Sequence, residues 1–360
     1  MITLHDMGWD DAWRLEWERH AFEPFGPARI TVVHRSHYEI WIPDRFCTGE
    51  VTGKMIHQAV SPGDYPVVGD WAAVHIPDMH SPAIIHGILP RRTCLQRKSA
   101  GREVLYQPIA ANIDTALIVQ AVDRDFNLPR LERYLVMIHD TKIRPVILLS
   151  KCDLIPEAGL DEIKMRISAR IGDCPVISCS SLDDTGIETV RRTILPGKTH
   201  CLLGSSGVGK TTLLNRLLME NRFETRPVRE KDQRGRHTTA RRQLIILDQG
   251  GLIIDTPGMR ELGNIDAGDG IETTFSDILD LADSCRFRDC THTVEAGCAV
   301  REAVDRNQLD EKRYENFLKL RRESEYHARS YMEKRQRDKA FGKMVKSIMK
   351  DKKRQWNRDT

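Results

Sequence analysis

The feature that most constrains this chain is a phosphate-binding loop in the middle of the sequence. The stretch Gly204-Ser205-Ser206-Gly207-Val208-Gly209-Lys210-Thr211 follows an apolar run and leads through Thr212 into a helix-like segment, which is the strand, loop and helix context of the motif. Its glycines let backbone N–H groups turn toward phosphates, Lys210 supplies a positive charge, and the Thr211 hydroxyl can ligate Mg²⁺. A Gly/Ser turn that merely precedes a helix would lack this combination. The sequence therefore predicts a nucleotide-binding site.

The bulk composition indicates a soluble, multidomain protein. At 360 residues the chain is long for one core, which predicts two or three domains. No apolar run approaches the roughly 18 residues of a membrane span, and the start lacks a secretory signal. Nine cysteines, an odd number and mostly scattered, favour reduced thiols over disulfides. We expect a cytoplasmic location and no membrane partner.

Residues 1–28 form an N-terminal extension in which Trp9, Trp13 and Trp17 recur at spacings of four. This spacing predicts one face of a helix. The face either packs against the next domain or docks a partner.

Residues 29–105 have the pattern of a small β-barrel. Turn signals separate short β-rich segments, and no helix-period stretch intervenes. The expected strands are Arg29–Arg35, Tyr38–Ile42, Glu50–Lys54, Asp70–Ile76 and Ala83–Leu89. Five such strands predict a barrel of the OB type, which often binds nucleic acid. Basic and aromatic residues favour RNA contact, with a purely structural barrel as the alternative: Arg35, Tyr38, Trp41, Arg45, Lys54 and Trp71.

Residues 106–272 change to an α/β pattern, in which two polar loops precede the phosphate loop. Thr115–Val119 and Arg144–Leu149 read as buried parallel strands, with helix-like Pro129–His139 between them. The second strand runs into Ser150-Lys151-Cys152-Asp153. A further strand, Pro175–Ile177, ends in Ser178-Cys179-Ser180.

Two more motifs follow the phosphate loop. Gly235-Arg236-His237-Thr238-Thr239 lies in an arginine-rich segment, and a strand pair then ends in Asp255-Thr256-Pro257-Gly258. An aspartate at a strand end, followed by a glycine turn, suits Mg²⁺ binding and sensing of a γ-phosphate.

Together these motifs resemble the signatures of a GTPase. In a conventional GTPase the two loops that contact the base follow the phosphate loop, whereas here the corresponding loops, Ser150–Asp153 and Ser178–Ser180, precede it. This order, with the Gly-Arg-His-Thr-Thr loop, a flanking barrel and a C-terminal cysteine cluster, resembles the RsgA (YjeQ) family of circularly permuted, ribosome-assembly GTPases. The likeness covers roughly residues 29–325 and is specific, because several unrelated motifs coincide in order. Permutation can preserve the site, since the termini of compact domains often lie close together.

The resemblance implies how GTP or GDP would be bound. Asp153 would accept the N1–H and N2–H₂ donors of guanine, with Lys151 lying along the base. A backbone N–H of Ser178-Cys179-Ser180 would approach guanine O6. The family usually has Asn where this chain has Ser150, so we expect weaker bracing or base affinity but a retained guanine preference.

The resemblance also implies the hydrolytic residues. Thr211 and either Thr238 or Thr239 would ligate Mg²⁺, with Asp255 behind these direct ligands. Met259 follows Gly258, and a thioether cannot orient an attacking water. In the family that task belongs to the histidine at the position of His237. The alternative is a loop histidine without a catalytic part. Because this group lies on an arginine-rich loop, we expect slow, partner-dependent turnover.

A cysteine and histidine cluster marks residues 273–330 as a helical, metal-binding domain. Cys285, Cys290, His292 and Cys298 offer three thiolates and one imidazole, which predicts a closed structural Zn²⁺ site. Ala296 stands where the family usually has Pro, and this change should have little effect because neither residue is a ligand. The helices expected beyond the cluster are Val300–Asn307 and Asp310–Tyr326.

Residues 331–360 form a basic tail. Eleven Lys and Arg against four Asp and Glu in 333–360 favour nucleic-acid binding over a merely solvated tail. The family implies the small ribosomal subunit and its rRNA as partners, and a GTPase that leaves the subunit after hydrolysis in late assembly or at a checkpoint. We expect a monomer. The rival hypotheses are a small-molecule kinase and an rRNA-binding scaffold with a passive nucleotide site.

Overall fold

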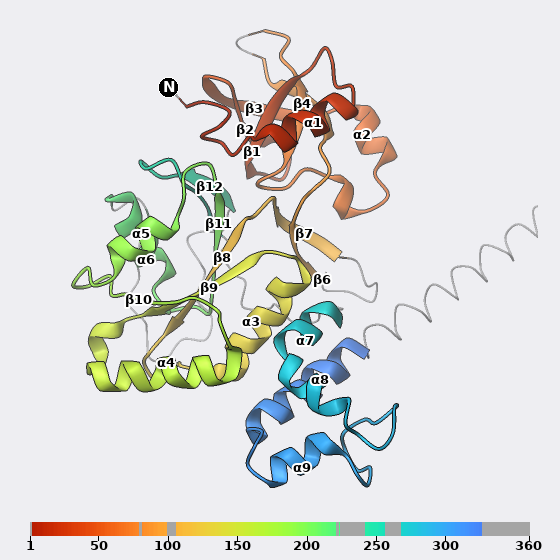
Figure 1. Cartoon of the computed structure of the whole chain (residues 1–360). Helices are drawn as coiled ribbons and strands as arrows, with labels where there is room; N and C mark the ends of the chain where they lie inside the picture. Colours follow the sequence, from red (N-terminus) through yellow and green to blue (C-terminus); the bar gives the residue numbers. More distant parts are fainter. Residues whose placement is uncertain are drawn as a thin grey trace, which may run out of the picture.

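The computed structural model describes residues 2–78, 81–98, 106–220, 223, 242–255 and 268–325. Figure 1 shows three parts: a β-barrel with the N-terminal segment, a central α/β domain, and a helical unit. In these residues no helix combines the length and the apolar character that crossing a membrane requires.

The α/β domain is built on a sheet of six strands. They are β8 (Thr115–Ala121), β9 (Arg144–Ser150), β10 (Val176–Ser178), β11 (Thr199–Leu203), β12 (Gln243–Ile246) and β13 (Leu252–Asp255). Their order is β10-β9-β8-β11-β13-β12. All neighbours pair in parallel except β12, which is antiparallel to β13. The expected parallel sheet is thus confirmed.

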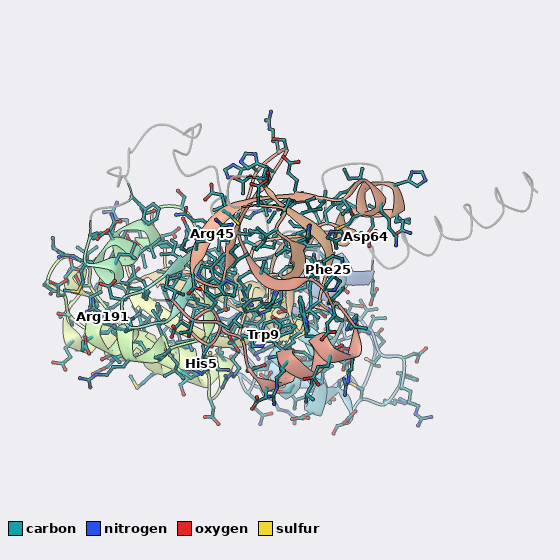
Figure 2. All side chains as sticks on the ribbon, turned by 90° about the horizontal axis from the view of Figure 1, so that it is seen from above. His5, Trp9, Phe25, Arg45, Asp64 and Arg191 are labelled. Atoms are coloured by element: carbon teal, nitrogen blue, oxygen red, sulfur yellow. The ribbon has the colours of Figure 1, made fainter. Side chains whose placement is uncertain are left out.

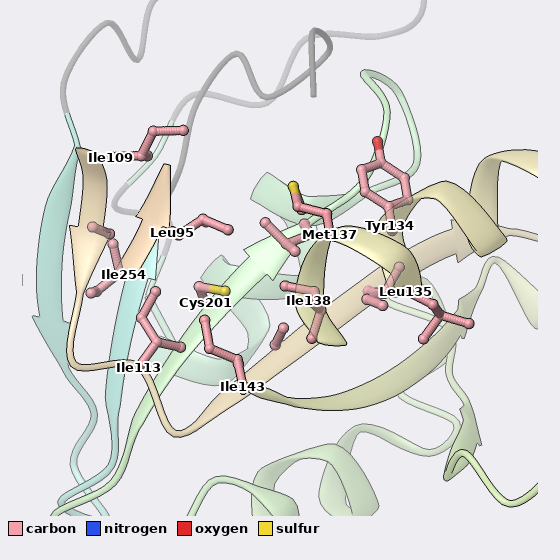
Figure 3. Packing of buried hydrophobic residues seen from close by; sticks show 14 of the residues in the cluster. Leu95, Ile109, Ile113, Tyr134, Leu135, Met137, Ile138, Ile143, Cys201 and Ile254 are labelled. Carbon is pink, nitrogen blue, oxygen red and sulfur yellow. The ribbon is translucent and has the colours of Figure 1, made fainter. Parts of the chain in front are cut away.

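Helices cover both faces of this sheet because its strands alternate two apolar faces. On β8, Ile118 packs in one cluster with Leu135, whereas Leu117 packs on the opposite face with Leu214. Figure 3 shows side chains of α3 directed at the strands. The helices are α3 (Leu128–Asp140) and α4 (Glu157–Ile171) on the first face, α5 (Ile187–Thr193) and α6 (Lys210–Leu218) on the second, with a short turn η2 (Cys152–Leu154).

Five strands close the N-terminal barrel, as the OB-type prediction requires. The strands are β1 (Gly26–Val33), β2 (Tyr38–Ile42), β3 (Arg45–Val51), β4 (Trp71–His75) and β5 (Ala83–Ile88). Their order is β1-β2-β3-β5-β4, and β4 pairs again with β1. Strand β1 also pairs with β12, at Val32 and Gln243, so barrel and α/β domain share one continuous sheet. A separate ribbon consists of β6 (Cys94–Lys98) and β7 (Tyr106–Ala111).

One expected strand of the barrel was wrong. The strand expected over 50–54 lies earlier in the chain: β3 spans Arg45–Val51, so only Glu50 and Val51 belong to it, and a helix, α2 (Gly53–Gln58), begins two residues later. The Thr52 side chain caps this helix by accepting a hydrogen bond from the N–H of Met55 at 3.2 Å. The expectation that no helix interrupts the barrel also fails, since a six-residue helix is too short to show a helical period. A 3₁₀ turn, η1 (Pro62–Asp64), follows it.

The tryptophans of the N-terminal segment pack against the barrel. Helix α1 (Asp11–Arg19) carries Trp13 and Trp17, whereas Trp9 precedes the helix, so the expectation of three indoles on one helix is wrong. Trp9 meets Trp71 of the barrel edge-on, with ring centroids 4.7 Å apart, and lies next to the barrel ribbon in Figure 2. The packing interpretation of these residues is confirmed.

Part of the RNA surface expected on the barrel is interior. Trp41 and Trp71 are 1% and 0% exposed, so neither can stack on a base. Both pack in one cluster with Met7 and Trp13 of the N-terminal segment, whereas their strand neighbours Ile40, Ile42, Ala72 and Val74 fill the barrel on the other face. Arg35 and Lys54, in contrast, are exposed.

The C-terminal unit consists of α7 (Gly268–Thr274), α8 (Ser276–Ala282), α9 (Ala299–Asp305) and a helix over residues 311–325. It packs on α3 of the α/β domain (Figure 1). The approach is close: a Cβ atom on Gly270 would lie 2.0 Å from the carbonyl oxygen of Val136. Only glycine fits at this contact.

A fully buried carboxylate ties this unit to the α/β domain. Glu132 of α3 accepts hydrogen bonds from Arg170 and Arg313 at 2.7 Å each and from Asn316 at 2.6 Å. Arg313 also pairs with Asp277 at 2.6 Å. Three charge-assisted hydrogen bonds satisfy the Glu132 carboxylate, so it can stay charged in the interior, although one nitrogen of Arg170, Nη2, has no hydrogen-bond partner among the described residues.

We expect Glu132→Ala to lower the free energy of unfolding by about 3 kcal/mol, because it leaves two guanidinium groups without their shared counter-ion. Urea denaturation followed by circular dichroism measures this change. Glu315→Ala, which removes an exposed carboxylate from the helix over 311–325, is the matched control. Equal stability of the two variants would contradict the role of the cluster.

Candidate functional site

The polar loops of the α/β domain meet at one edge of its sheet. Strands β8, β9, β10, β11 and β13 run in parallel, so their carboxyl ends lie together. The loops that leave this edge include residues 122–127, 151–156, 179–186 and 204–209. The topology thus brings together the phosphate loop and both loops expected to read the base.

The phosphate loop has the backbone that its glycines permit. Gly204 has φ +142°, and a Cβ there would lie 2.3 Å from the carbonyl oxygen of Val119. Gly209 has φ +93° and caps α6. The ammonium group of Lys210 donates to the carbonyl oxygens of Gly204 and Ser205, at 2.7 and 2.5 Å. The positive charge is therefore held inside the loop, where a phosphate would bind.

Ser150 braces the phosphate loop. Its hydroxyl donates to the carbonyl oxygen of Val208 at 2.6 Å, and both residues are buried. A shorter side chain than the family's usual asparagine thus still links the base-reading loop to the phosphate loop.

The base-reading loop after β9 presents a carboxylate. Lys151 has φ +60°, and its ammonium group pairs with Asp123 at 2.7 Å. Asp153 is exposed, and the described residues give its carboxylate no hydrogen bond and no ion pair. This carboxylate is available to a ligand that offers two N–H donors.

In the serine-rich loop after β10, the N–H of Ser181 is available to a ligand. The N–H groups of Cys179 and Ser180 donate to the carbonyl oxygens of Leu149 and Thr185, each at 2.8 Å, so they are already bonded. The next N–H, that of Ser181, has no partner among the described residues. The hydroxyl of Ser178 is buried and has no hydrogen-bond partner there.

Two aspartates after β8 were missed by the sequence analysis. Asp125 accepts a hydrogen bond from the phosphate-loop residue Ser205 at 2.8 Å. Burial by itself would raise the pKa of Asp123, but the hydrogen bonds from Lys151 and from the N–H of Asp125 bring it below its ordinary value. Their position, directly after a buried strand at the carboxyl edge, is the signal that could have found them.

Asp255 ends β13 beside the phosphate-loop strand, in register with Leu202. Burial raises the pKa of this carboxyl, and the positive charge of Lys210 opposes the rise. Thr211 lies in the first turn of α6. The other residues expected to serve hydrolysis and magnesium binding lie outside the described residues: His237, Thr238, Thr239 and Gly258.

The four expected metal ligands converge in the helical unit. The ligand atoms of Cys285, Cys290, His292 and Cys298 all lie within 4.8 Å of one another. Nδ1 of His292 is 3.6 Å from the sulfurs of both Cys285 and Cys298, which are 3.9 Å apart. A tetrahedral zinc ion, with bonds of ~2.3 Å to sulfur and ~2.0 Å to nitrogen, separates its ligands by roughly 3.6 to 3.8 Å. The geometry fits such an ion.

Local hydrogen bonds shape the loop that carries these ligands. Glu295 accepts from the N–H groups of Thr291 and Thr293, at 2.9 and 3.0 Å. The hydrogen bonds from Thr291 hold the pKa of Glu295 well below its usual range. The carboxylate thus fixes the turn around His292, which has φ +60°.

Comparison with known proteins points to one family. A model described as RsgA GTPase matches residues 88–265. The Opitutus terrae protein "Small ribosomal subunit biogenesis GTPase RsgA" is 40% identical over 338 residues, which is 91% of each chain. The Bacteroides thetaiotaomicron protein "Small ribosomal subunit biogenesis GTPase RsgA 1" is 40% identical over 347 residues, 96% of each chain.

Solved structures share the arrangement of strands and helices. The crystal structure of YjeQ from Thermotoga maritima superposes with a TM-score of 0.61 at 25% identity, covering 83% of this chain and 98% of that one. YloQ, described as a circularly permuted GTPase, gives a TM-score of 0.59 at 23% identity, covering 85% and 97%. The second likeness concerns the fold alone.

The contact between Ser150 and Val208 can be tested by Ser150→Ala. Losing a buried hydrogen bond should weaken GDP binding by about 1–2 kcal/mol, roughly 5- to 30-fold, because the loop loses its brace. Isothermal titration measures the affinity. Ser168→Ala, on the exposed side of α4, serves as control. If both variants bind GDP as tightly as the parent chain, the contact does not organise the site.

Proposed function

The chain belongs to the RsgA family of GTPases, and from this premise we propose that it binds the small ribosomal subunit, hydrolyses GTP there and is then released, late in assembly or at a checkpoint. The observation that carries the proposal is the meeting of the phosphate loop and the base-reading loops at one sheet edge. Family membership makes the chain a GTP hydrolase. The ribosomal role rests on the names of its relatives.

Guanine is the base that the loops suit. Asp153 would accept two hydrogen bonds from guanine N1–H and N2–H₂, and adenine offers no such pair of donors. The free N–H of Ser181 is the best candidate to donate to guanine O6, one residue beyond the Ser178-Cys179-Ser180 stretch named from the sequence. Ser150 and Asp125 would hold the phosphate loop in place from two sides.

Hydrolysis would use residues on two sides of the phosphates. Thr211 and either Thr238 or Thr239 would ligate Mg²⁺, with Asp255 and the turn at Gly258 close behind. His237 would hold the attacking water, since a neutral imidazole accepts a hydrogen bond near neutral pH. Magnesium would neutralise the charge that develops on the phosphates.

We also propose zinc as the ion of the cysteine cluster. Its four ligands leave no position for water, which favours a structural role over catalysis. The ion would link the loop of residues 285–298 to the core around Phe275 and Phe317.

Ribosomal RNA would be bound by exposed basic residues such as Arg35 and Lys54 of the barrel and by the basic tail. We propose that the protein acts as a cytoplasmic monomer. The alternative function is an rRNA-binding scaffold in which the guanine nucleotide is a passive ordering device; it differs by making hydrolysis dispensable.

GTP hydrolysis by the full chain, alone and with mature small subunits, tests the proposal. We expect strong stimulation with GTP but not with ATP. His237→Ala should retain GTP binding and lower the stimulated rate roughly 100-fold, because the water loses its orienting group. His57→Ala, at an exposed histidine of α2, is the matched control. An unstimulated rate in a protein that still binds subunits would favour the scaffold, and equal use of ATP would favour a kinase.

Metal removal tests the zinc assignment. Cys290→Ser should reduce the zinc content, measured by mass spectrometry, to background and lower the hydrogen-exchange protection of residues 268–325. GDP affinity should stay unchanged, because the cluster is remote from the phosphate loop. Cys47→Ser, at a barrel cysteine outside the cluster, should retain the metal. A metal-free parent chain with a fully protected helical unit would rule the assignment out.

A further inference from the structure

A cavity of about 220 Å³ lies where the N-terminal segment, the barrel and the α/β domain meet. It is far from the nucleotide loops, because it lies at the other end of the same strands. Arg144 and Thr199 open β9 and β11, whereas Ser150 and the phosphate loop lie at the carboxyl ends of these strands. The N-terminal segment contributes Asp10 to the wall.

The cavity wall is strongly basic. Its charged side chains are Arg29, Arg92, Lys142, Arg144, Lys198, Asp10 and Asp114, five cations against two carboxylates and so an excess of three positive charges. The two carboxylates have cationic partners already. Asp10 forms a two-pronged pair with Arg92, at 2.6 and 2.7 Å, which lowers the pKa of Asp10 to about 2. Asp114 lies 3.8 Å from Lys198.

The remaining cations have no carboxylate partner. Lys142 and Arg144 are exposed at the mouth, and the described residues offer neither side chain an ion pair. Both sit at the start of β9, one on each side of the buried Ile143. The positive charges of Lys142 and Arg144 repel each other, and an anion bound between them would reduce this repulsion.

Arg29 is the unusual member of the set. It is 1% exposed, and its guanidinium donates to the hydroxyl of Thr199 at 3.0 Å and to the carbonyl oxygen of Asn112 at 3.4 Å. Its Nε is buried without a hydrogen-bond partner, and the described residues give it no ion pair. Burial lowers the pKa of Arg29 to about 10, so the group is still charged at neutral pH.

Asp70 and Asp114 attract this charge from beyond ion-pair distance, and a buried charge with no direct counter-ion is unfavourable. The ring of Trp71, 4.9 Å from the guanidinium carbon, offsets this only in part. The two neutral acceptors, on Asn112 and Thr199, both bond to Nη2 of Arg29 and leave its Nε without a hydrogen bond. A ligand that carries negative charge and several acceptor oxygens would complete the site.

We propose that this junction cavity binds a small anion that carries a phosphate group, held by Arg29 from inside and by Lys142 and Arg144 at the mouth. A phosphate offers several oxygens to a guanidinium and to two further cations at once. The volume corresponds to about seven water molecules at roughly 30 Å³ each, which admits free phosphate or a small phosphomonoester. Sites for larger ligands usually exceed ~300 Å³.

Such a ligand would connect two domains. Arg29 lies on β1 of the barrel and Arg144 on β9 of the α/β domain, so the anion would be shared between them. Binding to the folded state alone would raise the thermal stability of the chain, with the logarithm of the ligand concentration once this exceeds the Kd.

Phosphate binding to the full chain tests the proposal. The nucleotide site is first saturated with Mg²⁺ and a non-hydrolysable GTP analogue, and orthophosphate or glycerol 3-phosphate is then titrated by calorimetry. We expect saturable binding and a rise in Tm. The double variant Lys142→Gln, Arg144→Gln should weaken this binding at least tenfold and leave the affinity for the GTP analogue unchanged. Tighter binding of one probe identifies free phosphate or a phosphomonoester as the ligand class.

The matched control is Lys312→Gln, Lys319→Gln, which removes two exposed lysines from the helix over 311–325 and should bind phosphate like the parent chain. Arg29→Gln should abolish binding. Should that variant fail to fold, the exposed double variant still decides the matter. Absence of saturable phosphate binding to the parent chain, or equal loss in the double variant and its control, would overturn the proposal.

Discussion

Hydrogen bonding between parallel strands brings the phosphate loop and the two loops expected to read the base to one edge of the sheet. Strand β11 sits between β8 and β13, and β9 lies one strand further, so all their carboxyl ends meet at one edge. These carboxyl ends lie at the same edge whatever order the strands have along the chain. The base-reading loop can therefore precede the phosphate loop in sequence and still donate, through Ser150, to the carbonyl oxygen of Val208. Permutation preserves the site because the sheet, and not the chain order, positions the loops.

Buried charge connects the domains to one another. Glu132 joins α3 and α4 to the helix over 311–325 through two arginines and an asparagine. In the barrel, Asp70 is fully buried and pairs with Arg91 at 2.8 Å, which joins β4 to the segment before β6. Such clusters add little net stability compared with apolar packing, but leaving one partner alone is strongly unfavourable. The Glu132 cluster therefore favours one arrangement of the helical unit on the α/β domain, and the Asp70–Arg91 pair favours one path of the segment before β6.

Much of this could be predicted from the sequence, because continuous apolar runs such as Thr115–Val119 and motifs such as the phosphate loop are local signals. The missed features are those that depend on tertiary contacts or on short elements. Helix α2 has six residues, Trp41 and Trp71 are buried rather than exposed, and the hydrogen bond between Ser205 and Asp125 joins residues 80 positions apart. The contact expected between the base oxygen and an N–H of Ser178-Cys179-Ser180 stays a prediction, and the structure adds that the N–H groups of Cys179 and Ser180 have internal hydrogen bonds. In most of these cases the residues that contact one another are far apart in the sequence, so a local sequence pattern does not identify them.

The shared sheet gives partner-dependent hydrolysis a physical route. Strand β12 pairs with β1 of the barrel on one side and with β13 on the other. In the sequence His237, Thr238 and Thr239 lie only a few residues before β12 begins at Gln243, and Asp255 ends β13. RNA bound to the barrel would thus act through β1 on β12. This strand directly follows the segment that carries the proposed catalytic histidine. Backbone hydrogen bonds transmit such a constraint without any side-chain relay, so coupling requires only that RNA binding favours one arrangement of that segment over another.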